Sequence, residues 1–316
     1  MMMIDVMRAR QRIAPYVRRT PLIRSAWLSD VAGARVSLKL ESQQLSNSFK
    51  ARGAFNAVIA RLERPGAPAQ LVTASAGNHG RGLAAAARIF NLPLVVFTPA
   101  NAPHTKLAAI RRDGADLRPD GRDYDEAERM ARAFAKETGA EFISPYSDAD
   151  VIAGAATVAL EMFEDEPDLD VLLVPIGGGG LISGVATVAK AIDPRCEVIG
   201  VEIAASNAFQ QSVRAGRLVE IVPGETLADG LGGNADPDTI TFAVIQQLVD
   251  RIVTVSEDDL VSAIVGLVET EHVIAEGAGA AATAAVVGKR VEVRDRRVGA
   301  IVSGSNIDRG RLQALL

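Results

Sequence analysis

Lysine is rare in this chain, and Lys50 differs from the other lysines in its surroundings. The chain has six lysines against 28 arginines. Lys50 follows small polar residues that include Ser46 and Ser48, stands beside Phe49, and begins an apolar run with helical spacing. An amine at a crowded, partly desolvated helix start loses its proton more easily and can condense with a carbonyl group to form a Schiff base. The alternative is a helical turn capped by Ser46 or Ser48, with the lysine in water.

The other five lysines are predicted to be surface groups. Lys39 alternates with Val36, Leu38 and Leu40, which indicates the solvent-facing position of a strand. The rest lie on amphipathic helices or in a charged loop: Lys106, Lys136, Lys190 and Lys289.

Four consecutive glycines follow an apolar run and precede a helical pattern. The run is Val171 to Ile176, the glycines are Gly177, Gly178, Gly179 and Gly180, and the helix is expected from Leu181 to Ala191. A strand, a glycine loop and a helix in this order form an anion site, because bare backbone lets several N–H groups and the positive end of the helix point at one phosphate.

Two other interpretations of the glycines stay open. In a dinucleotide fingerprint the last glycine position would fall on Ile182 or Ser183, which fits poorly, although Glu202 stands where a ribose-binding acid would be. A Walker loop is excluded because no Lys-Ser or Lys-Thr pair follows. The remaining possibility is a structural tight turn.

A second loop of the same kind follows the predicted strand over residues 70–74. It contains Ser75, Ala76, Gly77, Asn78 and His79, and it opens a helix predicted over residues 79–90. Two anion-holding helix starts suggest a ligand with two polar ends, and Asn78 offers both donor and acceptor atoms. The alternative is that Asn78 only caps the helix.

Bulk composition excludes several classes of function. The 316 residues have room for about two domains of roughly 150 residues each. A net charge of -5 without a basic stretch disfavours nucleic acid as a partner. The lone Cys196 excludes an internal disulfide, and the three histidines lack zinc-ligand spacing. No apolar stretch long enough for a membrane span is present, and the start lacks a signal peptide, so we expect a cytoplasmic protein.

Breaker sequences divide the chain. Proline and glycine over residues 64–68, and Ser-Pro-Tyr-Ser-Asp over 144–148, flank a segment in which short strands and helices alternate. The high content of alanine, valine, isoleucine and glycine suits parallel α/β layers. We therefore expect a small domain over 67–145 inserted in a larger one formed by 1–66 and 146–316.

Four motifs in order give the chain a family resemblance. They are Ser-Phe-Lys-x-Arg-Gly at Lys50, Ser-Ala-Gly-Asn-His-Gly at Asn78, the Gly-Gly-Gly-Gly-Leu loop, and a late Ser-Gly-Ser-Asn that begins at Ser303. In this order they resemble the serine/threonine dehydratase and serine racemase family of fold-type-II pyridoxal-phosphate enzymes. The resemblance implies a tryptophan synthase β-like fold, with two open parallel-sheet α/β domains, pyridoxal 5'-phosphate in the cleft and a small domain that closes over the substrate.

The resemblance also implies roles for individual residues. Lys50 would carry the cofactor covalently with Phe49 packed beside it, Asn78 would bind the ring hydroxyl, and Ser303 would face the ring nitrogen. Gly177 to Gly180, with Leu181, would hold the phosphate. The substrate carboxylate would lie against Ser75, Ala76, Gly77 and His79, while Glu276 and Gly230 would border the site.

By the same resemblance, the expected reaction is dehydration and deamination of a 3-hydroxy amino acid such as L-threonine or L-serine, giving a 2-oxo acid and ammonia. Racemases of the family carry a second serine where this chain has Ala76, so we expect little racemisation. A racemase, a β-replacement enzyme and a dehydratase of a bulkier hydroxy amino acid remain alternatives within the family. Outside it, the alternatives are a nucleotide- or NAD-binding protein that uses the glycine loop, and a non-catalytic binding module.

Three further features bear on the substrate side, the metal and the assembly. Ala155 and Ala156 replace the Gln-Gly of the family, and Ser305 replaces a glycine. Some relatives bind a divalent or monovalent cation through an acid that matches Glu202, but no second acid follows it closely here. The chain ends soon after the last predicted strand, without room for an appended regulatory domain, and relatives are commonly homodimers.

Overall fold

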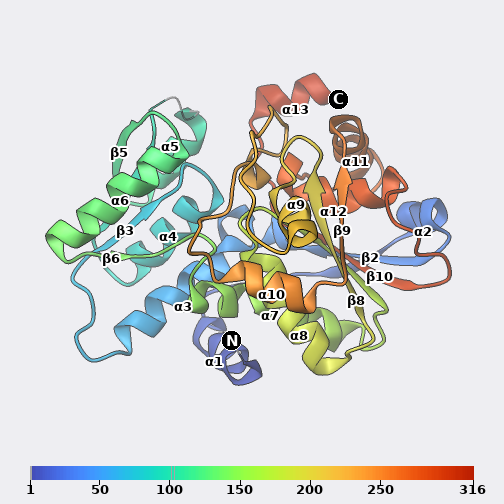
Figure 1. The fold of residues 1–316 in the computed structure, drawn as a ribbon, viewed down its shortest axis with the longest axis horizontal. Helices are drawn as coiled ribbons and strands as arrows, with labels where there is room; N and C mark the ends of the chain where they lie inside the picture. Colours follow the sequence, from blue (N-terminus) through green and yellow to red (C-terminus); the bar gives the residue numbers. More distant parts are fainter. Residues whose placement is uncertain (1, 101, 103) are drawn as a thin grey trace.

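The computed structural model describes residues 2–100, 102 and 104–316, and these residues form two β-sheets with helices on both faces of each (Figure 1). The larger sheet has six strands in the order β1-β2-β10-β7-β8-β9, and the smaller has four in the order β5-β4-β3-β6. β1 is antiparallel to β2, and the other neighbouring strands are parallel. The predicted parallel α/β architecture is confirmed.

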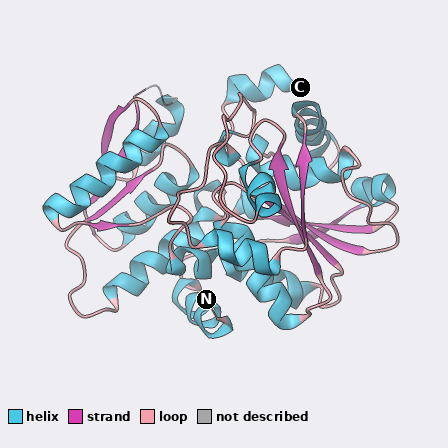
Figure 2. Cartoon of the chain, viewed as in Figure 1, coloured by secondary structure: helices cyan, strands magenta, loops and turns pink. Residues whose placement is uncertain are grey.

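The strands of the larger sheet come from both ends of the chain: β1 (Leu22–Ser25), β2 (Arg35–Leu40), β7 (Val171–Pro175), β8 (Glu197–Ile203), β9 (Arg251–Val255) and β10 (Arg297–Val302). One face packs against α2 (Ala26–Ala32), α11 (Glu257–Glu269) and α12 (Gly277–Val287). The other packs against α1 (Met3–Ile13), α7 (Ala149–Asp165), α8 (Gly180–Ile192), α9 (Ala208–Ala215) and α10 (Thr241–Leu248). Figure 2 shows the strands between these helices. Burial on both faces explains why the central strands β7 and β10 are apolar almost throughout.

The smaller sheet lies within the middle of the chain: β3 (Leu71–Ala74), β4 (Leu94–Pro99), β5 (Asp116–Gly121) and β6 (Glu141–Phe142). α6 (Tyr124–Thr138) covers one face, and α3 (Lys50–Leu62), α4 (Asn78–Ile89) and α5 (His104–Arg112) cover the other. The remaining helical segments are α13 (Arg309–Leu315) and the short 3₁₀ turns η1 (Glu41–Gln43), η2 (Leu45–Asn47) and η3 (Asp229–Leu231). No helix in the described ranges is long and apolar enough to cross a membrane.

Helix α3 packs against both layers. Its apolar side chains share a core with β3 and α4 of the smaller sheet, while its backbone meets α7 of the larger layer. A Cβ atom on Gly154 of α7 would lie 2.4 Å from the carbonyl oxygen of Arg52, so only glycine permits this approach. The predicted division at residues 66 and 146 stays a prediction, with α3 in contact with both sides of it.

A buried ion network ties α3 to its neighbours. The Arg52 guanidinium donates to Glu41, which follows β2, at 2.8 Å and to Glu161 of α7 at 2.6 and 2.8 Å. Lys39 Nζ donates to Glu161 at 2.6 Å and to the carbonyl of Thr20 at 2.7 Å. The prediction that Lys39 faces solvent is therefore wrong. Its side chain is fully buried, because α7 covers this face of β2 and supplies the carboxylate that balances the charge.

Replacing Arg52 is expected to destabilise the fold strongly. The change Arg52→Met leaves two buried carboxylates with Lys39 as their cation, and breaking a buried ion network in this way costs about 3–5 kcal/mol. Urea unfolding followed by circular dichroism measures the loss. The control is Arg195→Met, which removes an exposed pair with Asp193 and should leave the midpoint unchanged. Equal midpoints for the two variants would contradict a stabilising role for the network.

Candidate active site

Lys50 is the first residue of α3, and it lies where the chain crosses from the larger sheet to the smaller one. The N–H of Phe49 donates to the carbonyl of Ser303 at 3.1 Å, which holds the helix start against the end of β10. Lys50 Nζ donates to the carbonyl of Pro145 at 2.6 Å and lies 5.2 Å from the centroid of the Phe49 ring. Burial lowers the pKa of Lys50 to about 8.

The glycine loop joins the end of β7 to the start of α8. Gly179 has φ +86°, a left-handed conformation that favours glycine. A Cβ atom on Gly178 would lie 2.2 Å from Cγ of Tyr146, so the Tyr146 ring packs directly on the bare backbone. Within the described residues, the N–H groups of Gly177, Gly178 and Gly179 donate no hydrogen bond. Such a cluster of unused donors at a helix N-terminus suits a phosphate.

Residues from other loops enclose the glycine loop. Thr241 Oγ1 donates to the carbonyl of Gly178 at 2.9 Å, and the carbonyl oxygen of Gly230 would lie 2.9 Å from a Cβ atom on Gly177. The structure thus places the predicted Gly230 against the loop. Leu181 packs its side chain into the hydrophobic core, so only its backbone faces the loop.

The second loop connects β3 to α4. The N–H of Gly77 donates to Ser75 Oγ at 3.2 Å, and a Cβ atom on Gly77 would meet nothing within 4 Å, which leaves open space beside the Ala76-Gly77 backbone. His79 is buried, and burial together with the charge of Lys50 lowers its pKa to about 3. The imidazole is therefore neutral at physiological pH, and the anion-binding capacity of this loop rests on its backbone N–H groups.

Asn78, the first residue of α4, is held at both ends of its amide. Its Nδ2 donates to Glu276 Oε1 at 2.5 Å, and its Oδ1 accepts from Asn306 Nδ2 at 2.6 Å. Arg81, one turn along α4, donates to Asn306 Oδ1. The structure thus brings Glu276 beside Asn78. Arg81 and Asn306 were not singled out by the sequence motifs, although Asn306 ends the Ser-Gly-Ser-Asn motif.

Ser303 follows β10 and is buried. Its Oγ donates to the carbonyl of Ala278 in α12 at 3.3 Å. The next residue, Gly304, forms a β-bridge with Ser48, two residues before Lys50. These contacts bring the late motif of the chain beside the lysine.

Glu202 does not take part in this cluster. Both of its carboxylate oxygens accept backbone N–H groups at the start of α9, from Phe209 at 2.9 Å and Gln210 at 2.7 Å. Burial raises its pKa to about 7. A group of three or more His, Cys, Asp or Glu side chains that could hold a metal ion does not occur among the described residues, and the cation at Glu202 stays a prediction. The carboxylate acts as a helix cap.

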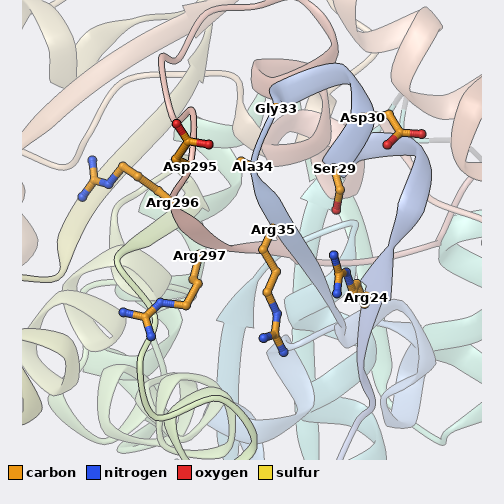
Figure 3. Close-up of a pocket in the computed structure, with 9 residues that line it drawn as sticks. All are labelled: Arg24, Ser29, Asp30, Gly33, Ala34, Arg35, Asp295, Arg296 and Arg297. Carbon is orange, nitrogen blue, oxygen red and sulfur yellow. The ribbon is translucent and has the colours of Figure 1, made fainter.

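A group of arginines lies around a cavity elsewhere in the structure. A cavity of about 400 Å³ is lined by residues on β1 and α2 and at the beginnings of β2 and β10: Arg24, Ser29, Asp30, Gly33, Ala34, Arg35, Asp295, Arg296 and Arg297 (Figure 3). Ser303 stands at the opposite end of β10, about 20 Å away along six strand residues. Arg296 and Arg297 are already paired with Glu197 and Asp170. None of the predicted site residues lines this cavity.

The residues of the predicted site fit a phosphorylated aldehyde. The lysine has a depressed pKa, the glycine loop has unused N–H donors, and Pro145-Tyr146 connects the two, because Pro145 accepts from Lys50 and Tyr146 packs on Gly178. Lys50, Asn78, Ser303 and the glycines therefore form one cluster at the carboxyl ends of β3, β7 and β10. Parallel sheets place ligand sites at this edge.

Comparison with known proteins decides the family. The model of the family described as "Pyridoxal-phosphate dependent enzyme" matches residues 13–304. The L-threonine ammonia-lyase of Thermotoga maritima is 41% identical over 304 residues, which cover 96% of this chain and 75% of that protein. The chain belongs to the pyridoxal-phosphate dependent enzyme family.

Two further relatives support this assignment. The L-threo-3-hydroxyaspartate ammonia-lyase of Saccharomyces cerevisiae is 38% identical over 312 residues, covering 99% of this chain and 95% of that one. The structure of maize serine racemase superposes with a TM-score of 0.92 at 33% identity, covering 99% of this chain and 96% of that chain. The predicted fold type II and the pyridoxal-phosphate cofactor are confirmed, and the alternative of an NAD-binding protein is set aside.

The rate at which the apoenzyme attaches the cofactor should report the pKa of Lys50. Only the neutral amine attacks the aldehyde, so the rate should rise about tenfold per pH unit below pH 8 and level off above it. An ordinary lysine would continue to accelerate to about pH 10. Stopped-flow absorbance of the bound cofactor measures the rate, with Lys50→Ala as the blank. A rate that still climbs steeply between pH 9 and 10 would contradict a desolvated amine.

Proposed function

We propose that this chain is an ammonia-lyase that removes water and ammonia from a 3-hydroxy amino acid such as L-threonine or L-serine, leaving a 2-oxo acid. The observation that carries the proposal is the amine of Lys50, with its pKa lowered to about 8, between a phosphate-type loop and a carboxylate-type loop. The names of the Thermotoga and Saccharomyces relatives support an ammonia-lyase, and the Saccharomyces name supports a bulkier hydroxy amino acid as the second candidate substrate.

The chain's own residues divide the work. The N–H groups of Gly177 to Gly179 would hold the phosphate, and the loop from Ser75 to His79 would hold the substrate carboxylate through its backbone. Pyridoxal phosphate, when bound, supplies a conjugated ring that withdraws electrons from the substrate Cα. Lys50 Nζ would take the proton from Cα, since its lowered pKa leaves a useful fraction of free amine near neutral pH.

Ser303 and His79 favour elimination over side reactions. A serine hydroxyl, unlike a carboxylate, would not stabilise a positive charge on the ring nitrogen of bound pyridoxal phosphate, so Ser303 would favour prompt loss of the β-hydroxyl. His79 is neutral, so it adds no positive charge that would stabilise negative charge on the substrate Cα. Closure of the smaller layer over the substrate would keep water away from the reacting atoms.

Turnover should depend on Lys50 and should not depend on an exposed lysine. Lys50→Ala should reduce release of 2-oxo acid by several orders of magnitude, because covalent attachment and proton transfer are lost together. Lys136→Ala, at an exposed position on α6, should match the wild type. The assay measures 2-oxo acid from L-threonine, L-serine and 3-hydroxyaspartate, and the substrate with the highest kcat/KM identifies the class. Full activity in Lys50→Ala, or no activity on any of the three substrates, would contradict the proposal.

Ala76 should keep the enzyme from racemising its substrate. Its methyl group cannot exchange a proton on the second face of Cα, so inversion of L-serine is expected to be at least tenfold slower than elimination. Chiral chromatography of residual serine, beside the 2-oxo acid assay, gives the ratio. The variant Ala76→Ser should shift that ratio toward D-serine. Inversion by the wild type at the rate of elimination would favour the racemase alternative.

The same proposal extends to the ligand, the assembly and the location of the protein. The partner is a small-molecule amino acid, and we infer a homodimer in the cytoplasm on the basis of the family resemblance. Sedimentation equilibrium of the purified chain tests the assembly, and a monomer at micromolar concentration would contradict it.

A further inference from the structure

Four polar side chains form one continuous hydrogen-bonded chain along a side of the active site. Arg81 Nη1 donates to Asn306 Oδ1, Asn306 Nδ2 donates to Asn78 Oδ1 at 2.6 Å, and Asn78 Nδ2 donates to Glu276 Oε1 at 2.5 Å. This hydrogen-bonded network connects α4, the segment after β10 and the start of α12. It includes the asparagine that the family motif places against the cofactor ring.

The two end groups, Arg81 and Glu276, fix the order of donors and acceptors along this hydrogen-bonded network. A guanidinium can only donate hydrogen bonds and a carboxylate can only accept them, whereas an asparagine amide accommodates either orientation. Arg81 and the carbonyl of Ser46 together fix the orientation of the Asn306 amide, so its carbonyl oxygen faces Arg81 and its amino group faces the other way. That amino group uses both hydrogens, one on Asn78 Oδ1 and one on the carbonyl of Ser46 at 2.9 Å.

This order of donors and acceptors determines which atoms of the Asn78 amide remain available to a ligand. Its carbonyl oxygen is taken by Asn306, and one of its two amino hydrogens is taken by Glu276. The second amino hydrogen is left for a ligand. A reversed amide would instead turn a carbonyl oxygen toward the ring oxygen of the cofactor, and two acceptors in contact repel each other.

We propose that Arg81 and Asn306 are positioning residues, which act through Asn78 to keep an N–H donor aimed at the ring oxygen of bound pyridoxal phosphate. The inference rests on the cofactor site proposed above. Arg81 donates to Asn306, so it acts on the cofactor through the two asparagines. Loss of the aligned donor should weaken cofactor binding, because a hydrogen bond to a charged oxygen is worth about a factor of ten or more in affinity.

Cofactor affinity of the apoenzyme tests the inference. Fluorescence titration with pyridoxal phosphate gives Kd, and the visible absorption maximum of the bound cofactor between pH 6 and 9 reports the ring oxygen's surroundings. Arg81→Met should raise Kd about tenfold and shift the absorption maximum. Arg81→Lys keeps a donor-only group and should recover most of the affinity. Arg88→Met, an exposed position on the same helix that pairs with Asp113, is the matched control and should match the wild type.

A second variant keeps the test decisive if Arg81→Met folds poorly. Asn306→Asp is nearly isosteric and retains a partner for Arg81, but its carboxylate cannot donate to Asn78, so it should raise Kd at least tenfold in a folded protein. The inference is overturned if either variant is folded and binds the cofactor with the affinity and spectrum of the wild type. Failure of the wild-type apoenzyme to bind pyridoxal phosphate would overturn the proposed function as well, so the two failures are distinguishable.

Discussion

The buried pairing of Arg52 with Glu41 and Glu161 is the interaction on which the geometry of the site depends. Arg52 lies two residues after Lys50, and its guanidinium bridges the segment after β2 and the last turns of α7. Because a planar guanidinium binds two carboxylates only in a narrow range of orientations, this pairing fixes where α3 begins and which way its first turn faces. Burying such charges costs desolvation energy, so their value here is specificity of position rather than stability alone.

The position of that helix start explains why segments distant in sequence form one site. Val302 pairs with Leu40 across β10 and β2, so Ser303 and Glu41 leave the larger sheet at the same edge. Phe49 is bonded to Ser303, and Lys50 is bonded to Pro145 at the return from the smaller sheet. The lysine thus stands where both sheets end, and each sheet contributes one loop whose N–H groups can hold an anion.

Local patterns in the sequence predict most of the fold, and long-range pairing accounts for what they miss. The pattern over residues 171–191 predicts the strand, loop and helix that the structure has as β7 and α8, because its signals are all contiguous. Lys39 looks exposed for the same local reason, and only α7, more than a hundred residues away, reveals its partner Glu161. Arg81, Tyr146 and Thr241 carry no motif of their own, and their contacts with the site depend on tertiary packing.

The site keeps formal charge away from the reacting amine, and this separation gives it its chemistry. Desolvation lowers the pKa of Lys50, and its direct hydrogen-bond partner is a neutral carbonyl. The nearby His79 is neutral, while the carboxylate of Glu276 is bonded to the Asn78 amide. A carboxylate beside Lys50 would hold it as an ammonium, and a full cation in either loop would lower the pKa of Lys50 further. Backbone N–H groups avoid both problems, because they bind phosphate and carboxylate without contributing a titratable charge.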